Sequence, residues 1–461
     1  MPTPSVLPPA PSGSPEHLPI AAALRALADG TQTAVSLLQR AHDNAVRVAD
    51  LNPLAHADWA LADRLAQALD EQRLRCGREG AAVPALLGIP LTIKDLFAVR
   101  GMPRRAGTRA TLPLADEGES TLVTRLRNAG ALIIAKTNMH EIALGATGEN
   151  TWTGDVCNPW NPAHQAGGSS SGAAVCAATG IGLGSIGSDT GGSVRIPAAF
   201  CGVTGFKPSF GAIPLDNALY LSWTCDHAGP LAATVDDCVR LFEVMAGRSM
   251  AHGVTPRAAR LGVPTTWLAG RLAPAVREQF DRSLAILRAA GAQIIDCPLP
   301  CLPQAWVCYS PIVRAEAATV HRAALANGGE GFSPSVLEPM QAGAKLSAVD
   351  YLVAMQTRQL VSDDLDRCLR DIDALVLPTT AVAAPLRGQV DVSVESGSMS
   401  VREAVLGQTL PFSMCGLPAL TMPTGFDLGL PLGLSVVGSR QGDAALLALG
   451  RWVETTLAGA T

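Results

Sequence analysis

The hydrophobic pattern of the first third of the chain predicts helices that precede short, fully apolar strands. Between Ile20 and Arg75, apolar residues recur at steps of three and four positions, which is typical of amphipathic helices, and Thr33 is suited to cap one of them. Two apolar runs follow, over 86–93 and 131–135. Each predicts a buried strand that ends in polar residues.

The same alternation returns in the second half of the chain. The predicted elements are strands over 260–264, 293–296, 374–377 and 434–438, and helices over 276–290, 349–370 and 443–456. Helices alternating with apolar strands favour an α/β fold in which helices cover both faces of a single large, mixed, mostly parallel twisted sheet. A boundary near residue 250 is an alternative, but we favour one catalytic domain over 19–461 after a Pro-rich, disordered tail over 1–18.

Residues 150–230 differ from both halves. Gly, Ser, Pro and Thr dominate there, periodicity is weak, and apolar pieces interrupt the stretch. A long glycine-rich segment inside an apolar chain is usually functional, because active-site residues often lie on loops held by a rigid scaffold.

Composition narrows the classes of function. The 461 residues are 48% apolar and 16% charged, with a formal net charge of −5, so neither a nucleic-acid footprint nor a basic membrane anchor is expected. Eleven scattered cysteines without a C-x-x-C pair predict reduced, buried thiols in a cytoplasmic protein. The eight dispersed histidines form no ligand motif, so we expect no metal and no cofactor.

Two glycine- and serine-rich clusters carry the candidate chemistry. The first is GGSSSG at 167–172, and the second is SDTGGSVRIP at 188–197. Successive glycines let several backbone N–H groups point at one spot, and such a nest can hold the oxyanion that forms when a nucleophile attacks a carbonyl. Ser193, at the end of the nest, is placed to be that nucleophile. Neither cluster contains a histidine base, and Lys94, at the end of an apolar strand, is the favoured alternative over Lys136 and Lys207.

These motifs resemble the amidase signature family. The similarity covers PLTIKDLF around Lys94, both glycine- and serine-rich clusters, the spacing between them, and the late pieces DALVLPT and PFSMCGLPAL. The resemblance implies that Ser193 is the nucleophile, that Ser169 lies on a cis peptide and relays protons, and that Lys94 is the base. It further implies supporting roles for other residues: an oxyanion hole from the N–H groups of Thr190, Gly191, Gly192 and Ser193, hydroxyl support of the lysine by Ser170 and Ser188, and a structural pair of Asp189 with Arg195.

The resemblance says less about the substrate. It places Ala143 and Leu144 beside the acyl pocket, and Tyr220, Leu221 and Trp223 in a segment where members vary. Apolar and aromatic residues there favour a neutral aryl or apolar amide, with carbamates (urethanes) and esters as other activities, and no arginine is recognisable as a ligand for a substrate carboxylate. His140 and Glu141 could form an acid–base pair, although Glu141 is better suited to fixing a loop.

Alternatives remain open at this point. The same family includes the amidase subunit of a tRNA-dependent amidotransferase, which works with partner proteins, and the chain could also be mainly an esterase or a non-catalytic binding protein. We expect a small-molecule amide or carbamate as the binding partner, no nucleic acid and no membrane, and a homodimer is one assembly left open.

Overall fold

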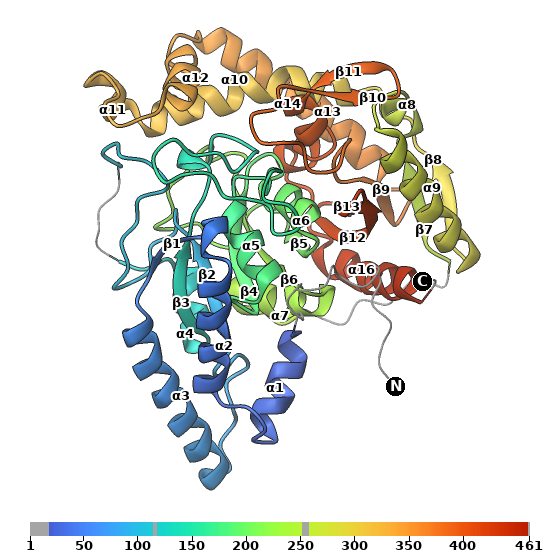
Figure 1. The fold of residues 1–461 in the computed structure, drawn as a ribbon. Coiled ribbons are helices and arrows are strands. Elements are labelled where there is room, and N and C mark those ends of the chain that lie inside the picture. Colours follow the sequence, from blue (N-terminus) through green and yellow to red (C-terminus); the bar gives the residue numbers. More distant parts are fainter. Residues whose placement is uncertain (1–17, 114–117, 251–257, 460–461) are drawn as a thin grey trace.

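The computed structural model describes residues 18–113, 118–250 and 258–459, and an 11-stranded sheet runs through it (Figure 1). The strand order is β1-β3-β2-β4-β6-β5-β12-β13-β9-β7-β8. The strands are β1 (Leu54–Ala57), β2 (Pro90–Lys94), β3 (Leu132–Thr137), β4 (Gly184–Asp189), β5 (Thr204–Lys207), β6 (His227–Ala232), β7 (Arg260–Val263), β8 (Gln293–Asp296), β9 (Ala374–Pro378), β12 (Ala419–Asp427) and β13 (Leu430–Val437). A separate hairpin joins β10 (Asp391–Val394) to β11 (Gly397–Ser400).

The sheet is mixed, as expected, but it is not mostly parallel. Strands β3, β2 and β4 are parallel at one end, and β9, β7 and β8 are parallel at the other. Every pair from β4 through β6, β5, β12 and β13 to β9 is antiparallel, as is β1 with β3. The prediction failed on direction because helices cover the central strands, and a strand buried on both faces is an apolar run whichever way it points.

Helices pack against the sheet in two groups. The helices are α1 (Ile20–Ala28), α2 (Ala34–Arg47), α3 (Trp59–Glu79), α4 (Thr121–Asn128), α5 (Ser171–Thr179), α6 (Arg195–Cys201), α7 (Val235–Ala246), α8 (Thr265–Leu268), α9 (Pro274–Ala289), α10 (Leu302–Val320), α11 (Arg322–Ala326), α12 (Pro334–Ala344), α13 (Ala348–Cys368), α14 (Val401–Leu406), α15 (Leu410–Met414) and α16 (Asp443–Ala458). Helix α5 touches α6 and α7 touches α16, and all four contact central strands. In Figure 1 the two pairs lie on opposite sides of these strands.

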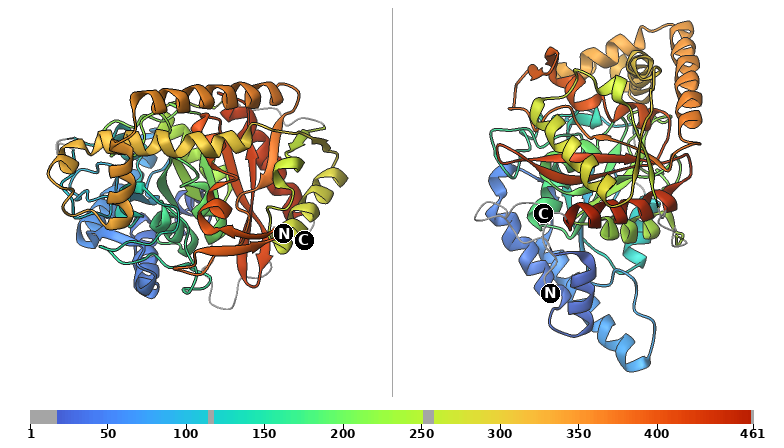
Figure 2. Two further views of the ribbon diagram at one scale, coloured as in Figure 1. Left: turned by 90° about the horizontal axis from the view of Figure 1, so that it is seen from above. Right: turned by 90° about the vertical axis from the view of Figure 1, so that its right-hand side faces the viewer.

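A third layer covers the end of the molecule that is far from α1–α3. Helix α10 packs against α12, α13 and α15, and Figure 2 shows α10 crossing this end. Neither α10 nor α12 was predicted, because each contains an internal proline, Pro311 and Pro339, and proline removes a helical hydrogen bond. This layer is important for function because α10 lines the cavity described below.

Local sequence signals elsewhere behave as predicted. Thr33 caps α2: its side chain accepts a hydrogen bond from the N–H of Ser36, and the Ser36 hydroxyl accepts one from the N–H of Thr33. The predicted strand over 434–438 is confirmed within β13. Its partner β12 was missed, because Pro423 and Gly425 interrupt its pattern where the register shifts.

Two further predictions concern cysteines and the chain start. Cys297 and Cys368 form a disulfide, so the prediction of reduced thiols is wrong for this pair, which joins the chain just after β8 to the end of α13. The predicted tail over 1–18 lies outside the described residues except for Leu18, and the single domain over 19–461 stays a prediction. Among the described helices, none combines the length and the apolar character that crossing a bilayer requires.

Candidate active site

Lys94 is the centre of a buried hydroxyl cluster. It is the last residue of β2, and its side chain is fully buried. The Nζ atom donates to the hydroxyl oxygens of Ser169 at 2.8 Å, Ser170 at 3.0 Å and Ser188 at 2.8 Å. The two segments that supply these serines are the glycine-rich stretch before α5 and the adjacent strand β4, which is why residues far apart in sequence meet at one amine.

The hydroxyl cluster is itself fixed by backbone hydrogen bonds. The Ser170 hydroxyl donates to the carbonyl of Ser188 and accepts from its N–H, so it cannot rotate freely. The Ser169 carbonyl accepts from the N–H of His140, and the peptide between Gly168 and Ser169 is cis. The N–H of Ser170 donates to the carbonyl of Ser193 at 3.2 Å, which ties the first glycine-rich cluster to the second.

Burial without a carboxylate partner changes the proton affinity of this amine. Burial lowers the pKa of Lys94 from 10.5 to about 7, and the charges of Asp189 and Asp226 oppose the shift. Desolvation disfavours the charged form of a lysine, and three neutral hydroxyls do not compensate as a carboxylate would. A large share of Lys94 is therefore neutral near pH 7 and can accept a proton.

Ser193 lies at the edge of a cavity, in a glycine-rich turn between β4 and α6. It is 5% exposed and lines the cavity together with Thr190. Within the described part of the chain, the N–H groups of 190–193 have no backbone or side-chain acceptor. Gly192 has a φ of +141°, and a Cβ at Gly191 would lie 2.3 Å from the Tyr309 hydroxyl, so a side chain at either glycine would distort the turn.

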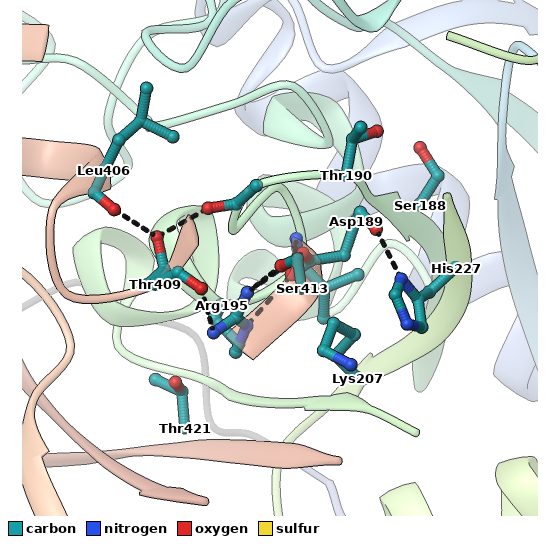
Figure 3. Close-up of polar contacts among 12 residues, drawn as sticks. Ser188, Asp189, Thr190, Arg195, Lys207, His227, Leu406, Thr409, Ser413 and Thr421 are labelled. Atoms are coloured by element: carbon teal, nitrogen blue, oxygen red, sulfur yellow. Dashed lines mark hydrogen bonds and ion pairs between the residues drawn. The ribbon is translucent and has the colours of Figure 1, made fainter. Parts of the chain in front are cut away.

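A buried ion pair holds this turn in shape (Figure 3). The Arg195 Nε and Nη2 atoms donate to the two carboxylate oxygens of Asp189, each at 3.0 Å, and both side chains are fully buried. Asp189 also accepts from the Ser413 hydroxyl at 2.7 Å, and Arg195 donates to the carbonyl of Thr409. Burial alone would raise the pKa of Asp189, but Arg195 holds it well below its usual range. The sequence did not reveal Thr409 and Ser413, which come from the distant α15 region.

A cavity of about 560 Å³ opens beside Ser193. Its apolar lining includes Ala143, Leu144, Leu221, Val313, Val405 and Leu406. Three of the five predicted substrate residues, Ala143, Leu144 and Leu221, therefore line it. Tyr220 does not: it lines a small neighbouring pocket, and Trp223, which is 41% exposed, does not line the cavity.

The loop that contains these residues is anchored by Asp226, another buried carboxylate that the sequence analysis missed. Asp226 accepts from the N–H groups of Leu221 and Ser222, and from the Thr190 hydroxyl at 2.6 Å. Burial raises the pKa of Asp226 to about 6, against these hydrogen bonds. Its contacts turn Leu221 toward the cavity, whereas Tyr220 lies outside it.

Charged residues in the lining were also missed. Arg314 and Arg402 line the cavity, as do Glu149 and His140, although no arginine was recognisable from the sequence as a ligand for a substrate carboxylate. Arg314 lies on unpredicted α10, and Arg402 follows the unpredicted hairpin β10–β11. No local sequence motif marks either arginine, because the two residues line one cavity only when α10 and α14 are packed in the folded chain.

The other candidate bases, and the candidate acid–base pair of His140 and Glu141, are less suited to proton transfer. The Lys136 amine donates to Asp95 at 2.9 Å and to the carbonyl of Pro103, and Lys207 donates to the carbonyl of Pro208. The Glu141 carboxylate accepts from Thr108, Trp152 and Ser333, so its hydrogen bonds hold segments together. Burial lowers the pKa of His140 to about 4, which leaves it neutral.

Comparisons with known proteins identify the family. Residues 36–447 match the family described as Amidase. A glutamyl-tRNA(Gln) amidotransferase subunit of Chloroflexus aurantiacus is 33% identical, over 94% of this chain and 95% of its own. The corresponding subunit of Pseudomonas fluorescens is 32% identical, over 91% of this chain and 93% of its own.

Solved structures show the same fold. A crystal structure of an amidase superposes with a TM-score of 0.91 at 47% identity, covering 95% of this chain and 99% of its own. A bacterial aryl acylamidase of the amidase signature family has a TM-score of 0.84, covering 95% and 96%, and its 24% identity supports the fold alone.

Proposed function

The chain belongs to the amidase family, and from this premise we propose that it is a serine hydrolase that cleaves the C–N bond of amides through an acyl-enzyme. One observation carries the proposal: a fully buried lysine amine, Lys94, bonded to Ser169 and to two further serine hydroxyls, beside a cavity lined by Ser193. A neutral amine in a chain of hydroxyls supplies the base that a serine nucleophile needs.

In the proposed reaction, proton transfer runs from Ser193 through Ser169 to Lys94, and a proton is later returned to the leaving nitrogen. Neutral Lys94 takes the proton of Ser169, Ser169 takes that of Ser193, and the Ser193 oxygen forms a bond to the substrate carbonyl carbon. The oxyanion accepts hydrogen bonds from the N–H groups of the turn over 190–193. Ser169 then returns a proton to the leaving nitrogen as the C–N bond breaks, because an unprotonated amide nitrogen is a very poor leaving group. Water, deprotonated by the same relay, hydrolyses the acyl-enzyme.

Amides with an apolar segment are the proposed substrates, because Ala143, Leu144 and Leu221 line the cavity. Carbamates (urethanes) and aryl esters present the same carbonyl to Ser193 and are proposed as further substrates. A release assay ranks the three. Wild type should release 4-nitroaniline from an acyl 4-nitroanilide, and Ser193→Ala should lose at least about a thousandfold in kcat.

The matched control for that assay is Ser398→Ala, an exposed serine on β11, which should keep the wild-type rate. A Ser193→Ala variant as active as wild type would contradict the nucleophile. A matched aryl carbamate and aryl ester, run in parallel, order the three activities.

A second candidate function is the amidase component of a tRNA-dependent amidotransferase. It is favoured by the 33% identity, over nearly the whole length of both chains, to one subunit of such an enzyme. The two candidates differ in their need for partners. Turnover of a simple amide by the purified chain alone supports the independent hydrolase, whereas activity that requires further subunits supports the amidotransferase role.

A further inference from the structure

The cavity wall carries two arginines, Arg314 and Arg402. Helix α10 contributes Ser310 and Arg314, which are four positions apart and so lie on one helical face, and α14 contributes Arg402 near its start. All three residues line the same cavity as Ser193. Neither the proposed acyl transfer nor the lysine–serine relay uses them.

Arg402 is held in place by neutral partners. Its Nη2 atom donates to the Ser310 hydroxyl at 3.0 Å, and its guanidinium lies over the Trp306 ring at 4.8 Å from the centroid. Stacking and one hydrogen bond orient the planar fork, and among the described residues most of its N–H donors have no protein acceptor. The side chain is pre-organised for a further acceptor.

Neither arginine has a carboxylate partner. Over residues 18–113, 118–250 and 258–459, no Asp or Glu forms an ion pair with Arg314 or Arg402. The neighbouring carboxylate, Glu403, is bound instead to Arg271 at 2.6 Å. Partial desolvation and the charge of Arg314 both lower the pKa of Arg402, although its side chain remains exposed. Two like charges on one cavity wall repel each other until an anion joins them.

Glu149 and His140 also line the cavity, and neither neutralises the two arginines. Glu149 accepts from the Thr147 hydroxyl and from the N–H of Gly388, and it makes no ion pair with either arginine in the described chain. His140 is neutral for the reason given above. An anionic ligand is therefore attracted to the α10–α14 wall and repelled from Glu149.

The arginine wall is also next to the proposed reaction centre. The Tyr309 hydroxyl packs against Gly191 in the turn that contains Ser193, and Tyr309 lines the same cavity as Arg314 and Arg402. A single small substrate can contact both the turn and the arginines.

We propose that Arg314 and Arg402 form a carboxylate subsite, so that the preferred amide carries a carboxylate. This inference rests on the proposed function for the placement of the scissile carbonyl at Ser193. It replaces the neutral amide expected from the sequence. The guanidinium fork of Arg402 matches the planar carboxylate, and Arg314 supplies the second charge.

Binding to the inactive Ser193→Ala variant tests this without turnover. Calorimetric titrations compare three amides of similar size: pentanoylanilide, which is neutral; glutarylanilide, with a carboxylate on the acyl side; and 4-(pentanoylamino)benzoate, with one on the amine side. We expect one of the two anions to bind at least about tenfold more tightly than pentanoylanilide. Which anion it is reports the side of the amide that faces the arginines.

Substitutions of the two arginines then test whether they cause the preference for an anionic amide. Arg314→Gln, whose side chain has no described hydrogen-bond or ion-pair partner to lose, and Arg402→Gln should each reduce the preference, and the double variant should abolish it, while the Kd of pentanoylanilide stays within about twofold. Arg402→Lys should keep part of the preference, because the charge remains and the fork is lost. Arg322→Gln, an exposed arginine on neighbouring α11, is the matched control and should change nothing.

Two results would overturn the subsite: equal affinity for all three amides, or an anion preference that survives in Arg314→Gln and in the double variant. Hydrolysis of pentanoylanilide by the wild type is a separate readout. It reports on the proposed function, so that failure of one idea does not hide failure of the other.

Discussion

Two buried cations near the same turn have opposite electrostatic surroundings. Lys94 is surrounded by three neutral hydroxyls, whereas Arg195 is paired in a bidentate manner with Asp189. Both side chains are fully buried, yet burial lowers the pKa of Lys94 to about 7, and the Arg195 pair lowers the pKa of Asp189 instead. The comparison separates a group that can exchange protons from a charged pair that fixes geometry.

A third buried cation makes the comparison sharper. Lys136, on β3, lies next to Lys94 in the parallel ladder, where Ile93 pairs with Lys136 and Lys94 with Thr137. Lys136 is bound to Asp95, and Lys94 is not. Two lysines of neighbouring strands thus differ in whether a carboxylate is present, which supports the assignment of the base to Lys94.

Removing the amine of Lys94 should have the largest effect. In Lys94→Met we expect kcat to fall by about a thousandfold, because a general base contributes about 10² to 10⁴. The free energy of unfolding should stay the same or rise, because an uncompensated buried amine is replaced by an apolar side chain of similar length. The 4-nitroanilide assay measures kcat, and urea unfolding measures stability. If the variant lost both its fold and its activity, Lys94 could not be assigned to proton transfer as opposed to stability.

Breaking the ion pair should instead affect stability. Arg195→Met leaves Asp189 buried without its partner, so we expect a loss of about 3 kcal/mol in the free energy of unfolding, measured by urea titration. The loss should grow with pH above the ordinary pKa of an aspartate, near 4, because only the ionised carboxylate is penalised by burial. A variant as stable as wild type would show that the turn is held by other contacts.

The pH dependence tests which form of Lys94 is active. In the folded chain its pKa is about 7, so kcat/KM should rise about tenfold from pH 6 to pH 8 and then level off as the amine loses its proton. The sign for stability is the same: between about pH 7 and 10.5 the unfolded chain binds the extra proton, so the contribution of Lys94 to stability rises with pH. A rate that falls with pH over this range would exclude the neutral amine as the base.

The smallest effect should come from Lys207, a further buried lysine whose pKa is lowered. Burial and the charge of Arg195 together lower the pKa of Lys207 to about 7 as well, but its amine donates to a backbone carbonyl and not to a serine hydroxyl. In Lys207→Met the midpoint of the pH–rate profile should therefore move by less than about 0.5 units. A midpoint that disappears in this variant would reassign the titration to Lys207.

The sequence was informative where function depends on contiguous motifs. Lys94, Ser169, Ser188 and Ser193 all lie in segments with recognisable patterns. The structure places the hydroxyls of Ser169 and Ser188 within hydrogen-bond distance of the Lys94 amine, and Ser193 in the turn between β4 and α6. Their catalytic roles stay predictions. Elements such as β2, β3, β9 and α9 were also predictable, because apolar runs and helical periodicity report burial directly.

The substrate side was not predictable in the same way. Arg314 and Arg402 come from α10 and α14, which the sequence separates by more than eighty residues, and only the packed layer brings them together. Tyr220 and Trp223 were named because their segment varies within the family, but the direction in which a loop residue points depends on backbone contacts such as those of Asp226. Strand direction likewise depends on long-range pairing, which an apolar run does not encode.

Asp226 also limits how this protein can diversify. One carboxylate receives the Thr190 hydroxyl from the turn next to Ser193 and two N–H groups from the loop over 221–222. An insertion or deletion in that loop would move the shared anchor and with it the turn, whereas an exchange of the Leu221 side chain would leave all three hydrogen bonds intact. Side-chain substitution at constant loop length is therefore the route by which evolution, or an engineer, can change the substrate range without losing catalysis.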